Sequence, residues 1–512
     1  MLFSSYIFLF TFLPVTLVGF CLLARFLGPK PAKVWLILSS LFFYGWWNPV
    51  YVVLILLSML FNYWLGRRIG LTVRGGRSGG LLLFWGVAAN LLLLGYYKYA
   101  NFFATNVNVV CGSHWSLGKI ILPLGISFFT FTQIAYLVDA KRGVVCEYDL
   151  GDFLLFITFF PHLIAGPIIH HSEMMPQFAE PKTYRFHWDN LAVGLGIFSI
   201  GLFKKVVIAD GLNPHVADVF SAAVAGDVLY SADAWDGVLS FTFQVYFDFS
   251  GYSDMAIALA RMFGIILPLN FNSPYKAVSI VEFWRRWHMT LSRFLGDYLY
   301  MPLTFSRCLQ NFVYIPLGGK RHGNYWRYVT LILTMGLAGL WHGAAWTFVV
   351  WGLFHGVCLT GNHLWRACQQ HWRLPSPLPR WATPWVARAF TFFLVVLSCA
   401  FFRATDLASA ARLLAAMFGV GTGPAPGTPA LLNVKDWIWL VGLLAFVWLM
   451  PNAVQLVRDQ QPYPAVTQDG WSPRNAWQRW RMTPAWASLT ALLLASSVLS
   501  LSRSGEFLYY NF

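Results

Sequence analysis

The sequence predicts an all-α integral membrane protein, and three observations support this fold class. Hydrophobic residues make up 57% of the 512 residues and charged residues only 11%, against about 25% charged residues in a soluble globular domain. The mean hydropathy is +0.56. Several uncharged runs reach the roughly 20 residues that a helix needs to cross a bilayer. These runs predict about eleven to thirteen apolar segments, some of them re-entrant or lying along the membrane plane.

The expected helical segments follow one another along the chain, joined by more polar connections. They are 2–24, 34–48, 51–66, 80–97, 119–138, 151–169, 190–205, 236–260, 328–363, 386–402, 435–457 and 484–502. The stretch 262–327 mixes aromatic and basic residues densely, which favours amphipathic helices at the membrane interface. We find no internal repeat, and the simplest division is one membrane domain over 1–512.

The net charge of +15 comes from basic residues that cluster in short loops between the expected spans. Such clustering is how the positive-inside rule orients a membrane protein, so it indicates contact with a lipid bilayer and not with nucleic acid. The pattern places both termini outside the cytoplasm. The first segment lacks a basic start and a small-residue cleavage site, so we expect an uncleaved span. The seven cysteines are scattered, and their spacing predicts neither a disulfide framework nor a zinc site.

His342 lies in the longest uncharged stretch of the chain, which is bounded by Arg327 and Arg366. As one helix this stretch would extend about 57 Å, far more than a bilayer, so we expect a break near Trp341, His342 and Gly343. An ionisable side chain in such sequence costs free energy unless it is paired or lines a wet cavity. Histidine also titrates near neutral pH. His342 is therefore the first candidate for a proton-handling residue. His355 follows later in the same stretch and is expected to be secondary.

A second candidate region surrounds His288, in the sequence EFWRRWH. On one continuous helix, Glu282 would neighbour Arg286, and His288 would neighbour Trp284 and Arg285. This arrangement would hold a second histidine in a charged cluster. A basic interfacial helix with a tryptophan belt explains the same residues, and both interpretations stay open.

Other polar residues near these histidines are candidates for supporting roles. Asp248 and Asp254 fall in an apolar run and could pair with arginine or histidine, or join helices. Asn270, Asn272 and Lys276 are expected to form a polar turn. The sequence IPLGGKR places Gly318, Gly319, Lys320 and Arg321 where backbone NH groups and cations could hold the phosphates of an anionic donor. A positive-inside turn is the alternative for this loop.

Several long motifs in this chain resemble the membrane-bound O-acyltransferase (MBOAT) family, and most of all its bacterial polysaccharide-acetylating branch. The motifs are FQVYFDFSGYSDMAIALARMFG, NFNSPYKAVSIVEFWRRWHMTLSRFL, DYLYMPL, IPLGGKR and GLWHGAAWTFVVWGLFHG, with core motifs between 240 and 363. The resemblance implies that His342 is the catalytic histidine and His288 the second histidine. It also implies a ring of tilted helices around a central tunnel. One departure is the segment between Leu303 and Tyr314, which interrupts a motif that runs unbroken in relatives.

The resemblance implies a function as well. An acetyl group from a cytoplasmic thioester, acetyl-CoA, would pass through the bacterial inner membrane for O-acetylation of an exopolysaccharide such as alginate or cellulose. The expected partners are an extracytoplasmic acetyltransferase or acceptor protein and an exopolysaccharide assembly complex. No bound cofactor or metal is expected. The aromatic C-terminus 507–512 resembles a motif in which a related D-alanylation partner carries its acyl group, and Tyr509 falls at the matching position. An aromatic belt at the end of a span is the alternative for these residues. Transfer of D-alanyl or another acyl group, or transport of an acetyl donor without catalysis, remain alternatives.

Overall fold

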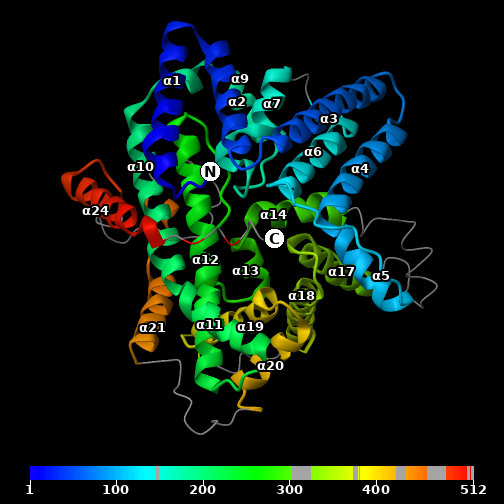
Figure 1. The fold of residues 1–512 in the computed structure, drawn as a ribbon, viewed down its shortest axis with the longest axis vertical. Coiled ribbons are helices and arrows are strands. Elements are labelled where there is room, and N and C mark those ends of the chain that lie inside the picture. Colours follow the sequence, from blue (N-terminus) through cyan, green and yellow to red (C-terminus); the bar gives the residue numbers. More distant parts are fainter. Residues whose placement is uncertain are drawn as a thin grey trace. The chain divides into compact units, whose positions relative to one another are not determined.

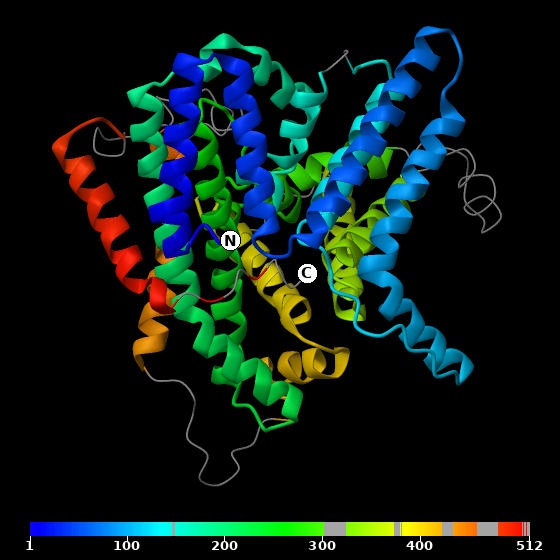
Figure 2. The same cartoon turned by 45° about the horizontal axis from the view of Figure 1, so that its top comes forward.

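The computed structural model describes residues 1–145, 149–301, 324–372, 379, 381–421, 434–457, 480–503, 505 and 508. Helices make up its regular structure in these residues, and no strand occurs among them. This confirms the predicted fold class (Figures 1 and 2). The chain forms two compact units that alternate along the sequence. Unit 1 comprises Met1–Val207, Phe249–Leu269 and Ala453–Asn511, and unit 2 comprises Ile208–Asp248, Asn270–Asn452 and Phe512.

Unit 1 is built from apolar helices that pack in groups. Its principal helices are α1 (Leu13–Phe26), α2 (Pro29–Gly45), α3 (Val50–Arg74), α4 (Gly80–Leu94), α6 (Ile126–Lys141), α7 (Leu150–Thr158), α9 (His171–Ala179), α10 (Trp188–Phe203) and α24 (Pro484–Ser500). Helix α1 lies beside α2, α6 packs against both α3 and α4, and α24 packs against α10 (Figure 1). The prediction of one domain over 1–512 depends on how the two units assemble, and it stays a prediction.

Buried amides join the helices of the α3, α4 and α6 group. Asn62 of α3 and Asn90 of α4 exchange side-chain hydrogen bonds of 3.2 and 2.7 Å. Asn62 also donates to Gln133 of α6 at 2.6 Å. Between apolar helices there is little hydrophobic driving force in lipid, and such bonds contribute to helix association.

Unit 2 contains the helices that hold the histidine candidates. They are α11 (Asn213–Ala225), α13 (Ile280–Arg286), α14 (Met289–Leu295), α17 (Asn324–His342), α18 (Trp346–Trp372), α19 (Thr383–Arg403), α20 (Leu407–Met417) and α21 (Val434–Leu449). Helices α17 and α18 form a tightly packed hairpin, and α18 also contacts α19 and α13. The long helix α12 (Ser231–Met262) contributes residues to both units.

Among the described residues, five helical segments are long and apolar enough to cross a membrane: Phe8–Phe26, Val50–Arg74, Gly80–Cys111, Trp188–Ala225 and Thr383–Arg403. Several other expected spans are shorter than predicted or interrupted. The expected 151–169 segment is one of them, since α7 ends at Thr158 and α8 covers only Phe160–Leu163. Phe159 between them has a non-helical ψ of 106°. The nearby Pro161 also disfavours a continuous helix here, because proline restricts the backbone of the residue before it.

Candidate active site

The turn between α17 and α18 positions His342. Helix α17 ends at His342, and α18 begins at Trp346, which confirms the break predicted from the length of the uncharged stretch. Two glycines allow the helices to approach. A Cβ added to Gly339 would lie 2.1 Å from the Phe348 carbonyl oxygen, and one added to Gly352 would lie 2.2 Å from that of Met335. Small residues at such contacts are typical of helix pairs in membranes.

His342 is 2% exposed and lies among aromatic rings. Its ring centroid is 4.9 Å from that of Trp341, 5.1 Å from that of Trp351 and 5.4 Å from that of Phe402, all at steep interplanar angles. Edge-to-face contacts of this kind fix the orientation of a ring. These contacts therefore hold the His342 imidazole rigidly at the turn between α17 and α18.

His288 lies at the junction of two short helices, which corrects the prediction of one continuous helix through EFWRRWH. Helix α13 ends at Arg286, Trp287 is extended, and His288 has φ 43° and ψ 54° as the residue that precedes α14. The predicted pairing of His288 with Trp284 and Arg285 one turn earlier is therefore wrong. A left-handed backbone at a residue other than glycine costs about 1–3 kcal/mol and is frequent at functional sites.

The hydrogen bonds of His288 define its tautomer. Its Nδ1 lies 2.9 Å from Asn270 Oδ1, and the Thr290 hydroxyl donates to the same oxygen at 2.9 Å. Because an amide oxygen only accepts, Nδ1 carries the proton and Nε2 carries the lone pair. The side chain is fully buried. Burial lowers the pKa of His288 to about 3, from its usual 6.5. His288 is therefore a neutral imidazole whose Nε2 can accept a hydrogen bond.

Trp341 connects the two histidine candidates. Its indole lies 4.9 Å from the His342 ring and 6.3 Å from the His288 ring, measured between centroids. The structure thus brings together two histidines that are far apart in the sequence. We call His288, Trp341, His342 and Trp351 the histidine–tryptophan centre.

His355 lies at the edge of this centre, and both of its ring nitrogens form hydrogen bonds. Trp284 Nε1 donates to its Nδ1 at 3.3 Å, so its Nε2–H donates to the Ser398 hydroxyl, 3.0 Å away. Its ring also contacts Trp351 at 4.9 Å. This pattern is typical of a histidine that holds α18 to α13 and α19.

The predicted polar residues around His288 divide into two groups. Arg286 forms the expected ion pair with Glu282, with Nη2 2.9 Å from Oε1, and also donates to the Asn272 backbone carbonyl at 3.1 Å. Asn272 is buried, and its side-chain oxygen accepts from Asn452 at 3.1 Å. Arg285 is exposed. Arg286 and Asn272 therefore shape the loop that leads to His288, whereas Arg285 faces outward.

The two candidate carboxylates lie in different units. Asp248 belongs to unit 2 and is buried. Asp254 belongs to unit 1, where Lys204 Nζ lies 2.7 Å from its Oδ2. Asp254 therefore pairs with a lysine, and not with one of the arginines or histidines that the sequence suggested. Two adjacent lysines, Lys204 and Lys205, interrupt an otherwise apolar run, and this was the available signal for the missed partner.

Five predicted site residues lie outside the described part of the chain. They are Gly318, Gly319, Lys320, Arg321 and Tyr509. The interrupting segment between Leu303 and Tyr314 lies outside it as well. The donor-side loop and the acyl-carrier tyrosine accordingly stay predictions.

Metal-capable side chains gather at one place in the described residues. Asp139, His170 and His171 of unit 1 each direct one ligand atom into a common space, with these atoms within 4.8 Å of one another. Predictions from cysteine spacing could not have found this group, since it contains no cysteine.

The apolar spans and the buried histidine–tryptophan centre define an α-helical membrane protein with two buried histidines near one tryptophan. The chain belongs to the membrane-bound O-acyltransferase family, whose sequence pattern matches residues 140–311 and 304–403. It is therefore an O-acyltransferase, as the motifs predicted. It is 44% identical over 449 residues to a peptidoglycan O-acetyltransferase of Helicobacter pylori, covering 82% of this chain and 80% of that protein.

Two other kinds of relative are informative. A probable alginate O-acetylase AlgI of Azotobacter vinelandii is 38% identical over 541 residues, covering the whole of both chains. A teichoic acid D-alanyltransferase of Streptococcus thermophilus is 29% identical over 243 residues, covering 47% of this chain and 57% of that protein. The predicted family and polysaccharide-acetylating branch are confirmed by these similarities.

Proposed function

We propose that this chain transfers an acetyl group from a cytoplasmic thioester, acetyl-CoA, across the membrane for O-acetylation of an exopolysaccharide such as alginate or cellulose. The proposal rests on the histidine–tryptophan centre, in which His342 and a neutral His288 both contact Trp341. Relatives named as a peptidoglycan O-acetyltransferase and a probable alginate O-acetylase, 44% and 38% identical to this chain, support acetyl as the transferred group.

In the proposed reaction, His342 acts as the general base. It takes the proton of an acceptor hydroxyl while that oxygen attacks the thioester carbonyl carbon. The tetrahedral intermediate then expels the thiolate of coenzyme A, which takes the proton back from the His342 imidazolium. Such proton transfer contributes typically about 10²–10⁴-fold to the rate. The products are an O-acetyl ester and the free thiol.

His288 is proposed to orient the acceptor or the thioester. With Nδ1–H committed to Asn270, its Nε2 can accept a hydrogen bond from a hydroxyl. Because burial lowers the pKa of His288 to about 3, it keeps this acceptor character throughout the physiological pH range. His288 and His342, which both contact the Trp341 ring, would then act on the same substrate.

The path of the acetyl group includes residues outside the described structure. Gly318, Gly319, Lys320 and Arg321 would hold the phosphates of acetyl-CoA on the cytoplasmic side, and Tyr509 could accept the acetyl group before an extracytoplasmic partner transfers it to the polymer. The expected ring of helices around a tunnel would provide the route. We place the protein in the bacterial inner membrane with both termini outside the cytoplasm, as the loop charges favour.

Transfer of D-alanyl is the second candidate function. Its support is the similarity to two teichoic acid D-alanyltransferases, at 29% and 27% identity. The higher identity and wider coverage of the O-acetyltransferase relatives favour acetyl. A transporter of an acetyl donor would need no general base. The rigidly held His342 therefore favours catalysis over transport alone.

Mass spectrometry of the cell-surface polymers tests this function. Exopolysaccharide and peptidoglycan are compared from strains that carry the chain, lack it, or carry His342→Ala, with His187→Ala as the exposed-histidine control. We expect O-acetyl groups on one polymer with the native chain and the control only. D-alanyl esters in place of acetyl would select the second candidate. Equal acetylation of both polymers in all four strains would refute the proposal.

A further inference from the structure

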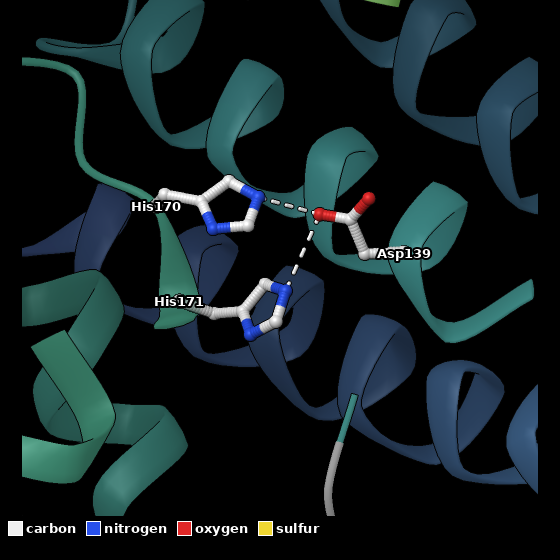
Figure 3. Close-up of side chains that lie close together, drawn as sticks. All are labelled: Asp139, His170 and His171. Atoms are coloured by element: carbon white, nitrogen blue, oxygen red, sulfur yellow. Dashed lines mark hydrogen bonds and ion pairs between the residues drawn. The ribbon is translucent and has the colours of Figure 1, made fainter. Parts of the chain in front are cut away.

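Two histidine rings in unit 1 turn toward one carboxylate oxygen, as Figure 3 shows. His170 Nε2 lies 2.6 Å from Asp139 Oδ2, and His171 Nε2 lies 3.3 Å from the same atom. The side chain of Asp139 is 4% exposed, that of His171 1% and that of His170 25%. The group is thus buried on one side and open to solvent at the His170 edge.

Local structure holds these three side chains in place. Asp139 is in the last turn of α6, and His170 is the residue that precedes α9. The Glu173 carboxylate accepts from the His170 backbone N–H at 3.3 Å, which closes a capping box. The Tyr136 ring meets the His171 ring edge to face, 6.2 Å away. The ligand atoms therefore come from two helix ends whose geometry does not depend on a ligand.

We propose that Asp139, His170 and His171 bind one divalent transition-metal ion of the zinc class, with water as the fourth ligand on the side of His170. Two imidazoles and one carboxylate are the donor set that zinc accepts in open sites, with bonds of about 2.0–2.2 Å. Tetrahedral ligands on such bonds are about 3.3 Å apart, which is the distance between His171 Nε2 and the carboxylate oxygen. The His170 ring would move outward by about 0.7 Å to meet the same spacing.

The contacts behind the ligand atoms match those that support metal ligands elsewhere. His170 Nδ1 lies 2.6 Å from the Ser172 hydroxyl and accepts from the Ser172 backbone N–H at 3.4 Å. When Nε2 binds metal, the proton moves to Nδ1, the hydroxyl accepts it and the long backbone hydrogen bond is given up. Arg142 Nη1 lies 3.2 Å from Asp139 Oδ1, which orients the carboxylate with Oδ2 toward the two imidazoles. Outer contacts of this kind orient ligands, and their loss typically weakens metal binding about 10–100-fold.

The competing explanation is a charge network without metal, in which Asp139 accepts from both imidazoles and from Arg142. The two explanations differ in which ring nitrogen of each imidazole carries the proton. Without metal, His170 Nε2 donates to the carboxylate, and the Ser172 hydroxyl donates to Nδ1. With metal, neither Nε2 atom carries a proton, and His170 Nδ1–H donates to the Ser172 hydroxyl. A bound ion would fasten the end of α6 to the start of α9, and this role does not depend on acetyl transfer.

Metal analysis of the full-length protein tests the proposal. The chain is purified in detergent with a tag free of histidine, and its zinc content is measured by mass spectrometry before and after dialysis against Zn²⁺. We expect about one ion per chain in the native protein and in His187→Ala, and loss of that ion in His171→Ala and Asp139→Asn. Ser172→Ala should retain the site with affinity about 10–100-fold weaker.

Two measurements on the native protein avoid dependence on the folding of variants. Co²⁺ should give the visible absorption bands of a four-coordinate ion, which Zn²⁺ displaces. The apparent unfolding temperature should rise with Zn²⁺ and fall after chelation, because a ligand of the folded state stabilises it. The absence of saturable Zn²⁺ or Co²⁺ binding, or equal binding by the His171→Ala and His187→Ala variants, would overturn the proposal and leave the charge network as the explanation.

Discussion

The close packing of α17 against α18 makes Gly339 the position where one added methyl group should displace His342. A Cβ at Gly339 would lie 2.1 Å from the Phe348 carbonyl oxygen and 3.2 Å from the Gly352 Cα. These are backbone atoms of the facing helix, so no side-chain rotation relieves the contact. The helices must separate by at least 0.9 Å, from 2.1 to 3.0 Å, to admit the methyl group.

The expected effect on activity follows from this displacement. His342 follows Gly339 by less than one turn and ends the same helix. A displacement of about 1 Å in a catalytic group can cost about 10²-fold in rate. Overpacking of this kind also typically destabilises by about 1–3 kcal/mol. Gly339→Ala should therefore lower kcat/KM for acetyl transfer by about 10²-fold and lower the apparent unfolding temperature.

Gly361→Ala is the matched control, because Gly361 is in α18 and a Cβ there would meet nothing within 4 Å. Alanine is up to about 1 kcal/mol more favourable than glycine inside a helix, so this variant should be at least as stable as the native protein and fully active. Both variants are assayed in lipid nanodiscs with radiolabelled acetyl-CoA. If Gly339→Ala and Gly361→Ala show the same rate and stability, the hairpin contact does not position His342.

Three further predictions concern single contacts. Burial lowers the pKa of His288 from 6.5 in the unfolded chain to about 3 in the folded protein, so its contribution to stability is present above pH 6.5 and is lost as the pH falls toward 3. Thermal unfolding should show a loss of about 2 kcal/mol between pH 7 and 5 in the native protein, and no such loss in His288→Asn. Asn270→Leu should reduce kcat by about 10²-fold, because it releases the His288 ring that orients the substrate. Asn270→Asp still accepts from Nδ1 and should keep most of the native rate in the same assay. Lys204→Met should destabilise by about 3–5 kcal/mol in denaturant titrations, because it removes the ammonium group that pairs with the buried Asp254 carboxylate. Lys204→Met combined with Asp254→Leu should recover stability, and equal stability of the single and double variants would contradict this.

The break at His342 could be predicted because it follows from length alone. The uncharged stretch between Arg327 and Arg366 is too long to cross a bilayer as one helix, and the structure ends α17 at His342. The family could also be predicted, since its motifs are long and specific. Both predictions rest on information that is local in the sequence.

The geometry around His288 could not be predicted in the same way. Local spacing favours one helix through EFWRRWH, but tertiary contacts end it early. The Asn272 backbone N–H donates to the Arg286 carbonyl at 2.9 Å, and the Met289 backbone N–H donates to the Asn270 carbonyl at 2.9 Å. These bonds join segments that are far apart in the sequence, so the spacing of residues within EFWRRWH cannot predict them.

The pairing of Asp254 with Lys204 shows a similar limit. The two residues are distant in the sequence, and several cations were equally plausible partners on sequence grounds. Close packing of α10 against α12 within unit 1 places Lys204, the residue that follows α10, beside Asp254, with Nζ 2.7 Å from the carboxylate. The proposed metal group of Asp139, His170 and His171 also depends on contact between separate helices.

Whether His342 is the base for acetyl transfer can be decided by a single-turnover measurement. Purified native protein and His342→Ala are mixed with radiolabelled acetyl-CoA and a soluble acceptor, and the rate of ester formation is followed over pH. We expect the variant to be about 10²–10⁴-fold slower and to gain rate as hydroxide replaces the base. A His342→Ala rate equal to that of the native protein at neutral pH would contradict this assignment.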